Sequence, residues 1–382
     1  MNGRLIALGL CLVAGATAGA QDPLVATMDR LATELLRSTR TPGVAVVLVR
    51  NDSVVLARGY GRRSIAAADA VDGNTLFAVG SFTKGVTAAA LVTLVDQGRL
   101  RWDDPVRQHL PAFHLSDSWI SEHVTVRDIA SIRAGLSGAD SILTPTRSPQ
   151  QVLARSAELP ATEFRTGFGL APNFSFFVAG ELAAAVGSRS WEDLVRERLL
   201  APLGMTSTTP RLAVVLASNN LARPHARRGD SIVLLEPQSY EHAIGAGSLY
   251  SNAADIGNWL RLQLGRGRFN GQQIISEASM REMHTPHVVS AGGTYQGMFN
   301  RHASMLGYGL GWLTSDYRGR KVIEHGGVNG AYTAYIVFLP RENIGFAVLT
   351  NLNQSAVWNP IQDMKFTLLD AVIGPAANAV RP

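Results

Sequence analysis

The sequence predicts a mixed α/β (α+β) fold, in which an antiparallel β-sheet is built from both chain ends, is flanked by helices and is interrupted by a large all-helical insertion. Three observations predict it. Strand-like, β-branched runs lie near both ends of the chain, the middle has apolar residues at helical spacing, and no repeat or low-complexity linker is present. With 382 residues, 46% of them hydrophobic, the chain can bury one large core or two interleaved ones.

The first twenty residues have the order of a secretory signal peptide. Arg4 precedes an apolar run over 5–13, and small residues lead to Ala20, where cleavage is expected. This predicts an exported protein, periplasmic or secreted. An uncleaved anchor is the alternative, because one Arg makes a weak positive region. The only cysteine, Cys11, lies in this run, so the mature chain would have no disulfide and no cysteine metal site.

The sheet is expected from two hairpin-like pairs of strands. Asn51-Asp52 separates the first pair and has the composition of a two-residue hairpin turn. The second pair lies near the C-terminus and is followed by a helix. The expected elements are a helix over 28–37, strands over 43–50 and 53–60, strands over 330–339 and 344–350, and a last helix over 356–372.

The middle of the chain is expected to be helical, with further helices following it. Apolar periodicity predicts helices over 82–97, 174–186, 253–264 and 277–283, and glycines end the first two. The predicted organisation is therefore a signal peptide over 1–20, a sheet domain made of 21–75 and 236–382, and a helical domain over 76–235. No later segment has the length of a membrane helix, so no stable span is expected after signal removal.

The charge of the chain carries little functional information, with one exception. Lys and Arg number 35 against 30 Asp and Glu, for a net charge of +5, but no basic run stands out, so nucleic-acid binding is not expected. Lys occurs only at Lys84, Lys321 and Lys365. Because Lys can lose its proton when buried and Arg cannot, a surviving Lys can mark a place where an amine is needed. Genomic bias toward Arg is the alternative explanation.

Lys84 lies three residues after Ser81, at the start of the first central helix. That spacing places both side chains on one helical face, and the helix N-terminus adds amide donors. A neutral amine, its pKa lowered by burial, could accept the serine proton. The four-residue pattern alone is weak, since a Ser cap followed by a surface Lys gives it as well.

The surrounding residues strengthen this hypothesis. They resemble the class C branch of the serine β-lactamase and D-alanyl-D-alanine carboxypeptidase superfamily, including its esterases. The resemblance covers most of 25–370 in the family's order. Its motifs are Phe77, Gly80-Ser81-x-x-Lys84, Gly98-x-Leu100-x-x-Asp103-Asp104-Pro105-Val106, Val124-Thr125-Val126-Arg127-Asp128, Gly135-Leu136, Pro202-Leu203-Gly204-Met205 with Thr208, Gly245-x-Gly247-x-x-x-Ser251-x-x-x-Asp255, Met283-x-Thr285-Pro286, Tyr308-Gly309-Leu310-Gly311-Trp312, His325-Gly326-Gly327 and Leu349-Thr350-Asn351.

The resemblance implies a serine β-lactamase-like fold and a set of roles. Ser81 would be the catalytic nucleophile that forms an acyl-enzyme, and Lys84 its amine partner. The substrate-binding residues would be Asn173, which orients the substrate amide or Lys84, and His325, Gly326, Gly327 and Val328 on a strand at the pocket edge. The amides of Ser81 and Val328 would form the oxyanion hole.

The family pattern breaks at two positions. Its second motif is Tyr-x-Asn, but here Ala171 stands where the tyrosine belongs, and Ile132 replaces a usual histidine. The tyrosine normally helps to move protons, so three readings remain open. Lys84 acts alone, with water or a substrate group completing the cycle; another side chain such as Tyr240 or His242 substitutes as the base; or turnover is lost.

The leading hypothesis is an exported serine hydrolase acting on esters, β-lactams or D-amino-acid amides through acyl-Ser81. The alternative is a catalytically impaired protein whose pocket binds a peptidoglycan-like or acyl ligand. Either way the expected partner is a small-molecule or peptide acyl compound, with no cofactor and no metal. The sequence specifies neither the substrate nor the oligomeric state.

Overall fold

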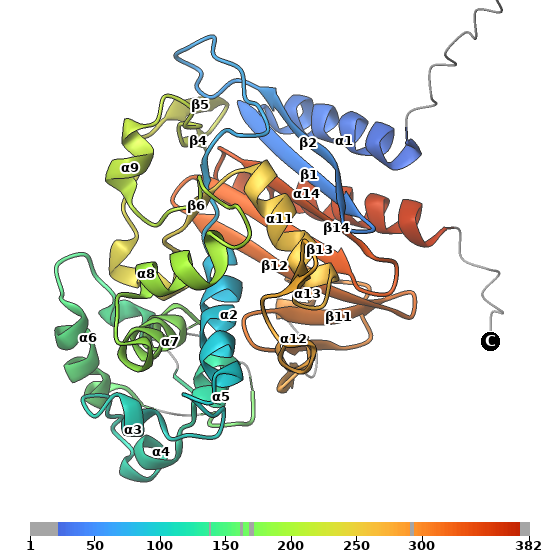
Figure 1. Cartoon of the computed structure of the whole chain (residues 1–382). Coiled ribbons are helices and arrows are strands. Elements are labelled where there is room, and N and C mark those ends of the chain that lie inside the picture. The colour runs from blue at the N-terminus through green and yellow to red at the C-terminus, as the bar shows by residue number, and fades with distance from the viewer. Residues whose placement is uncertain (1–21, 137–138, 161–162, 168–171, 291–293, 375–382) are drawn as a thin grey trace, which may run out of the picture.

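The computed structural model describes residues 22–136, 139–160, 163–167, 172–290 and 294–374. Eight strands form one antiparallel sheet in the order β2-β1-β14-β13-β12-β11-β10-β9. Both chain ends contribute to it, because the N-terminal strand β1 pairs with the C-terminal strand β14 (Figure 1). The strands are β1 Gly43–Arg50, β2 Ser53–Gly61, β9 Val288–Ser290, β10 Leu306–Tyr308, β11 Leu313–Tyr317, β12 Arg320–Asn329, β13 Tyr332–Leu339 and β14 Ile344–Thr350. The expected fold class is confirmed.

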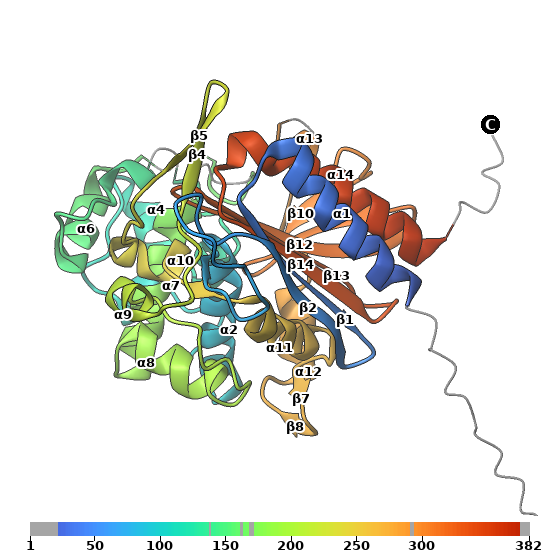
Figure 2. The ribbon, with the colours of Figure 1, turned by 90° about the horizontal axis from the view of Figure 1, so that it is seen from above.

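The central strands β1, β14 and β13 are buried on both faces, which explains why β1 is apolar from Gly43 to Val49. Val44, Val46 and Leu48 face one cluster of buried residues, while Val47 and Val49 face the other. Helices α1 Pro23–Thr39 and α14 Gln354–Ile373 lie side by side on the first face (Figure 2). Helix α11 Ala253–Leu264 packs on β1 and β14 from the opposite face.

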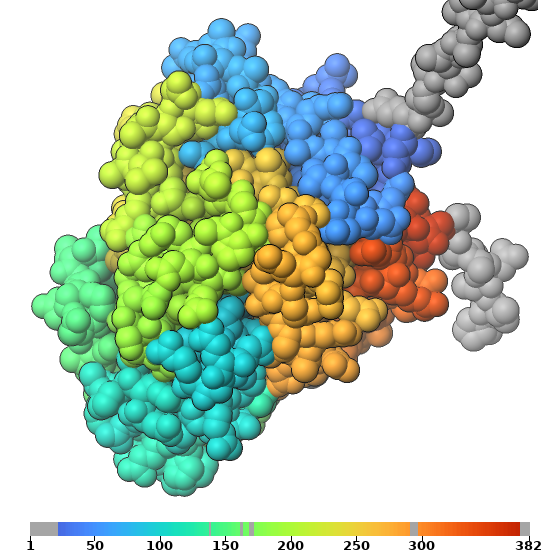
Figure 3. All heavy atoms as spheres, viewed as in Figure 1, coloured from blue at the N-terminus to red at the C-terminus, as the bar shows by residue number. Residues whose placement is uncertain are grey.

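The expected hairpin between β1 and β2 is present. Asn51 and Asp52 have φ values of 48° and 61°, and a two-residue loop with both φ positive matches the right-handed twist of the flanking strands. In the space-filling view the blue N-terminal segments lie against the orange and red C-terminal ones (Figure 3). The pairing of β1 with β14 thus joins two distant parts of the sequence in one sheet.

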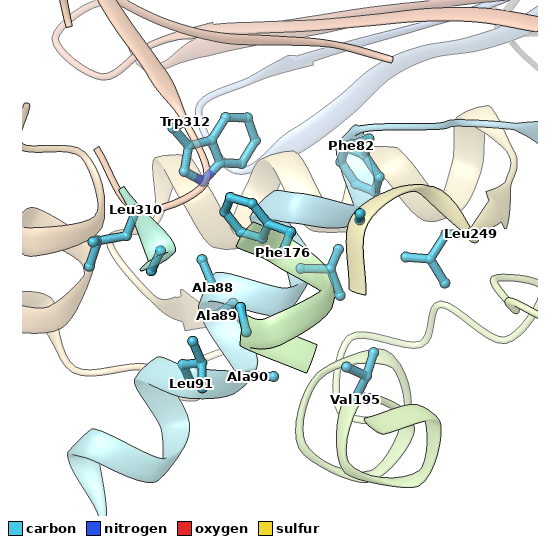
Figure 4. Close-up of a cluster of buried hydrophobic side chains, with 14 of the residues drawn as sticks. Phe82, Ala88, Ala89, Ala90, Leu91, Phe176, Val195, Leu249, Leu310 and Trp312 are labelled. Atoms are coloured by element: carbon cyan, nitrogen blue, oxygen red, sulfur yellow. The ribbon is translucent and has the colours of Figure 1, made fainter. Parts of the chain in front are cut away.

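Helix α2 Phe82–Asp96 is the centre of the helical part of the molecule. Almost all its side chains are buried, so it is hydrophobic all round rather than amphipathic. Phe82 and the run 88–91 pack among Phe176, Leu249 and Trp312 (Figure 4). The other helices of the described residues are α3 Val106–His109, α4 Ser118–His123, α5 Val126–Ala130, α6 Pro149–Arg155, α7 Pro172–Gly187, α8 Trp191–Val195, α9 Leu212–Ala217, α10 Ile244–Gly247, α12 Glu277–Met283 and α13 Thr294–Phe299. Short helical turns are η1 Ala139–Ile142, η2 Ser156–Glu158, η3 Arg196–Leu200 and η4 Glu241–Ala243.

The interval expected to be helical also contains strands. The hairpin of β4 His225–Arg228 and β5 Ser231–Leu234 falls within it, as does β3 Phe77–Ala78, which pairs with β6 Tyr250–Ser251. A further small pair joins β7 Arg268–Phe269 to β8 Gln272–Gln273. The domain boundaries at residues 75 and 236 stay predictions, and the expected signal peptide over 1–20 lies outside the described residues.

Candidate active site

Ser81 and Lys84 meet at the N-terminal end of α2. Ser81 is the N-cap of this helix, and Lys84 lies one turn further on the same face. The Nζ–Oγ distance is 2.7 Å. The spacing of the two residues in the sequence therefore places their functional groups in direct contact.

The Lys84 amine is buried and has two further oxygen neighbours. Nζ lies 2.8 Å from Asn173 Oδ1 and 3.0 Å from the Ala246 carbonyl oxygen, and the side chain is 1% exposed. Its burial lowers the pKa of Lys84 to about 7, although the charge of Asp140 acts in the opposite direction. Near neutral pH a large fraction of the amine is therefore uncharged.

Asp140, on η1, stands behind Asn173. Its Oδ2 accepts a hydrogen bond of 2.8 Å from Asn173 Nδ2, and its Oδ1 accepts one of 2.8 Å from the backbone N–H of Phe174. Burial raises the pKa of Asp140, while the Phe174 N–H, Lys84 and Asn173 lower it. Nothing in the sequence pattern singled out this residue.

Strand β12 brings the predicted substrate-binding glycines against the start of α2. A Cβ placed on Gly327 would lie 2.0 Å from the Val79 carbonyl oxygen, and one on Gly80 would lie 2.5 Å from the backbone nitrogen of Val328. Only glycines permit this approach, and Gly80 also has a left-handed φ of 51°. The two amides expected to form the oxyanion hole, those of Ser81 and Val328, are thus on neighbouring segments.

His325 lies on β12 next to Tyr308 of β10. Its Nδ1 is 2.7 Å from the Gly326 carbonyl oxygen, and its Nε2 is 3.2 Å from the Tyr308 hydroxyl. A carbonyl only accepts, so Nδ1 carries the proton and Nε2 accepts from Tyr308. Burial, with a smaller contribution from Lys84, lowers the pKa of His325 to about 3, and burial raises the pKa of Tyr308. Both side chains are neutral at pH 7.

A cavity of about 190 Å³ opens beside these groups. The lining residues with polar side-chain groups include Ser81, Lys84, Tyr308, His325 and Gln354. Its walls are mainly apolar, and its lining also includes Ile132, Pro172, Phe299, Leu313, Gly326, Val328 and Trp358.

The structure does not bring the two suggested substitute bases to this cavity. Tyr240 and His242 stack on each other with ring centres 5.5 Å apart, and neither lines the cavity. Ala171 lies outside the described residues, whereas Ile132 lines the cavity with a left-handed φ of 53°, a strained conformation for a β-branched residue. The sequence identifies Tyr308 only as part of a motif. The pairing of β10 with β11 places its side chain at the cavity.

Two kinds of feature are relevant to metal and membrane binding by the described residues, a cluster of metal-ligating side chains and a helix able to span a membrane. Among them, no group of three or more His, Cys, Asp and Glu side chains is arranged to hold a metal ion. In the same part of the chain, no helix combines the length and the apolar character needed to cross a bilayer.

Sequence comparisons relate the chain to known proteins. A family model described as Beta-lactamase matches residues 28–362. The chain is 29% identical over 352 residues to unguisins hydrolase ungD' of Aspergillus campestris, covering 87% of this chain and 62% of that protein. It is 22% identical over 339 residues to Protein flp of Staphylococcus aureus, covering 86% and 64%. The chain thus spans under two thirds of the length of these relatives.

Two solved structures share the fold. The penicillin-binding protein homologue from Pyrococcus abyssi, described as octameric, superposes with a TM-score of 0.77 at 24% identity, covering 92% of this chain and 77% of that chain. EstCE1, described as a hydrolase with promiscuous acyltransferase activity, gives a TM-score of 0.76 at 18% identity, covering 92% and 98%. At these identities the likeness establishes the fold alone.

Proposed function

Because the chain belongs to the Beta-lactamase family, we propose that it is a serine hydrolase that forms an acyl-enzyme on Ser81, with the neutral amine of Lys84 as the base. The observation that carries this proposal is the 2.7 Å contact between Ser81 Oγ and a buried Lys84 Nζ. A desolvated amine whose pKa is near 7 can take a proton from a hydroxyl that it touches.

The oxygen neighbours of Lys84 favour this direction of proton transfer. As an ammonium ion, Lys84 can donate to all three of them. Once it is neutral, it keeps two N–H groups and one lone pair. Asn173 Oδ1 and the Ala246 carbonyl can only accept, so they hold the two N–H groups. The lone pair then faces Ser81, the one neighbour of the three that can donate.

The reaction follows from this arrangement. The Ser81 proton passes to Lys84 Nζ as Oγ bonds to the acyl carbon, and the amides of Ser81 and Val328 face the developing oxyanion. The bond to the leaving group then breaks, and that group takes the proton from Lys84. Water repeats the sequence in the second half. Its proton passes to Lys84 as its oxygen bonds to the acyl carbon, the bond between Ser81 Oγ and the acyl carbon then breaks, and Oγ takes the proton from Lys84. This is the first of the three readings, in which Lys84 works without the motif tyrosine.

We further propose that the substrates are neutral esters with a short apolar acyl group. The cavity walls include Phe299, Leu313 and Trp358, which suit an apolar group. Among the described lining residues, Lys84 and His325 are the only titratable nitrogens, and both are neutral at mildly alkaline pH. The undescribed segments 137–138, 161–162, 168–171 and 291–293 contain no Lys, Arg or His. A substrate carboxylate would therefore be buried without a cationic partner.

A pair of matched esters tests this preference. We expect p-nitrophenyl butyrate to be hydrolysed at least about tenfold faster, by kcat/KM at pH 8, than the p-nitrophenyl monoester of succinic acid, since one unpaired charge costs more than about 1.4 kcal/mol. His325→Arg, which adds a cation that keeps its proton when buried, should reduce that ratio. Equal rates for the two esters would contradict a cation-free pocket.

Covalent labelling tests the acyl-enzyme itself. A fluorophosphonate probe should add one label per folded chain, and peptide mapping should place it on Ser81; Ser81→Ala should take up none. The rival, a binding protein without turnover, would instead give an unlabelled Ser81 and ligand-induced stabilisation that persists in Ser81→Ala. For protein taken from its own cells, the same intact-mass measurement reads the N-terminus, which starts at Gln21 if the proposed export and cleavage occur.

A further inference from the structure

The carboxylate of Asp140 takes no part in the proposed proton transfers, but it contacts Asn173, which in turn contacts the Lys84 amine. We propose that Asp140 is a positioning residue of the active site, which acts through Asn173 to aim the lone pair of Lys84 at Ser81. The inference rests on the proposed function, because it concerns the base of that reaction. Three successive contacts carry it: Phe174 N–H to Asp140 at 2.8 Å, Asn173 to Asp140 at 2.8 Å, and Lys84 to Asn173 at 2.8 Å.

The first step is the orientation of the Asn173 amide. This side chain has one end that donates and one that accepts, and its neighbours decide which way it faces. The ionised carboxylate of Asp140 only accepts, so the Asn173 NH₂ group must face it. The amide oxygen is thereby turned toward Lys84 and takes one of its N–H groups. The opposite orientation would set oxygen against carboxylate and N–H against N–H.

The second step is the anchoring of the carboxylate. Phe174 is in the first turn of α7, where backbone N–H groups lack partners within the helix, and Asp140 accepts from one of them. The carboxylate is thus held from two sides, by the helix end and by Asn173. The Asn173 side-chain amide is therefore held in one orientation and is not free to rotate.

The third step is electrostatic. The titratable groups near the amine are Asp140 from η1, and Tyr308 and His325 from the sheet, of which the latter two are neutral. Asp140 is therefore the one that opposes the loss of charge on Lys84, and its charge raises the pKa of Lys84 against the effect of burial. Replacing the carboxylate by an amide removes that charge and also reverses the donor pattern seen by Asn173.

Asp140→Asn is the matching variant, because it keeps the shape of the side chain. The new amide can still accept from Phe174, but its NH₂ group would then face Asn173, whose own amide must turn and present N–H to Lys84. The amine lone pair would be drawn to Asn173 and away from Ser81. We expect fluorophosphonate labelling of Ser81 to slow by about 10- to 100-fold. The pH at which the labelling rate rises should also move to a lower value.

A direct titration of the amine gives a readout that does not depend on turnover. The chain has only three lysines, so protein carrying ¹³C-lysine gives three Cε signals, of which Lys84→Met identifies one. The Lys84 signal should titrate near pH 7 in the wild type and at lower pH in Asp140→Asn. An unchanged midpoint, together with a labelling rate within twofold of the wild type, would overturn the inference.

Two further variants separate positioning from general destabilisation. Asp255 is another buried carboxylate, bonded to Thr208 and to the Ser207 N–H, and Asp255→Asn should lower the Tm without moving the Lys84 midpoint. The double variant Asp140→Asn/Asn173→Asp restores an acceptor facing Lys84 and puts the charge beside it. This double variant should recover labelling of Ser81 at alkaline pH, and the midpoint of its Lys84 titration should lie above that of the wild type. Failure of wild-type labelling would remove the acyl-enzyme proposal, while the lysine titration would still decide this one.

Discussion

Replacing Lys84 by arginine is expected to slow acylation of Ser81 by about 10³- to 10⁴-fold, the range for removal of a positioned general base. A guanidinium group keeps its proton at every accessible pH and has no lone pair to offer Ser81. In the wild type, labelling should rise with pH through about 7, as the Lys84 amine loses its proton. The measurement is the second-order rate of fluorophosphonate labelling between pH 5 and 9.

Two variants make this result interpretable. Lys321→Arg is the matched control, since Lys321 is partly buried and bonds to the His284 carbonyl oxygen, away from the cavity. It should label at the wild-type rate. Lys84→Met removes the amine without adding bulk, in case arginine prevents folding. If folded Lys84→Met keeps a labelling rate within tenfold of the wild type, another group is the base, and Tyr308 with His325 becomes the first candidate.

The sequence predicts the fold well because the relevant patterns are local. The run 43–50 is apolar at every position but the last and is followed by a two-residue turn, so a hairpin whose first strand is buried on both faces is the simple solution. Strand-like runs near both chain ends predict one sheet built from the two ends, but the pairing of β1 with β14 is a long-range contact that no local pattern specifies. Ser81 and Lys84 could be placed together because three residues in a helix fix their relation.

The rest of the site depends on contacts between distant segments. Asp140 and Asn173 are 33 residues apart, and neither a helix nor a strand connects them at a fixed spacing. Asp140 therefore carries no periodic signal. Tyr240 and His242 are candidate substitute bases on sequence because they precede Gly245, but proximity in sequence does not fix the direction of a side chain, and neither residue lines the cavity. Tyr308 does line it, because strand order places β10 two strands from β12.

Gly327→Ala is expected to cost about 100-fold or more in labelling rate, because the added methyl group has no space. Its Cβ would lie 2.0 Å from the Val79 carbonyl oxygen and 3.2 Å from the Ser81 nitrogen. Val79 is fixed on both sides, since its N–H donates to Leu249 and its carbonyl accepts from Phe82 in the turn that begins α2. The strand and that turn must therefore separate, which moves Ser81 away from the Val328 amide and loosens the oxyanion site.

The same overpacking should lower the free energy of unfolding by about 1–3 kcal/mol, measured by urea denaturation. Gly247→Ala is the matched control, because its Cβ would be 3.9 Å from the nearest atom, Gly80 C, an ordinary contact close to the same site. It should retain both stability and labelling. A destabilised but folded Gly327→Ala that still labels at the wild-type rate would show that the close approach of β12 to α2 serves packing alone, and that the Val328 amide has no part in acylation.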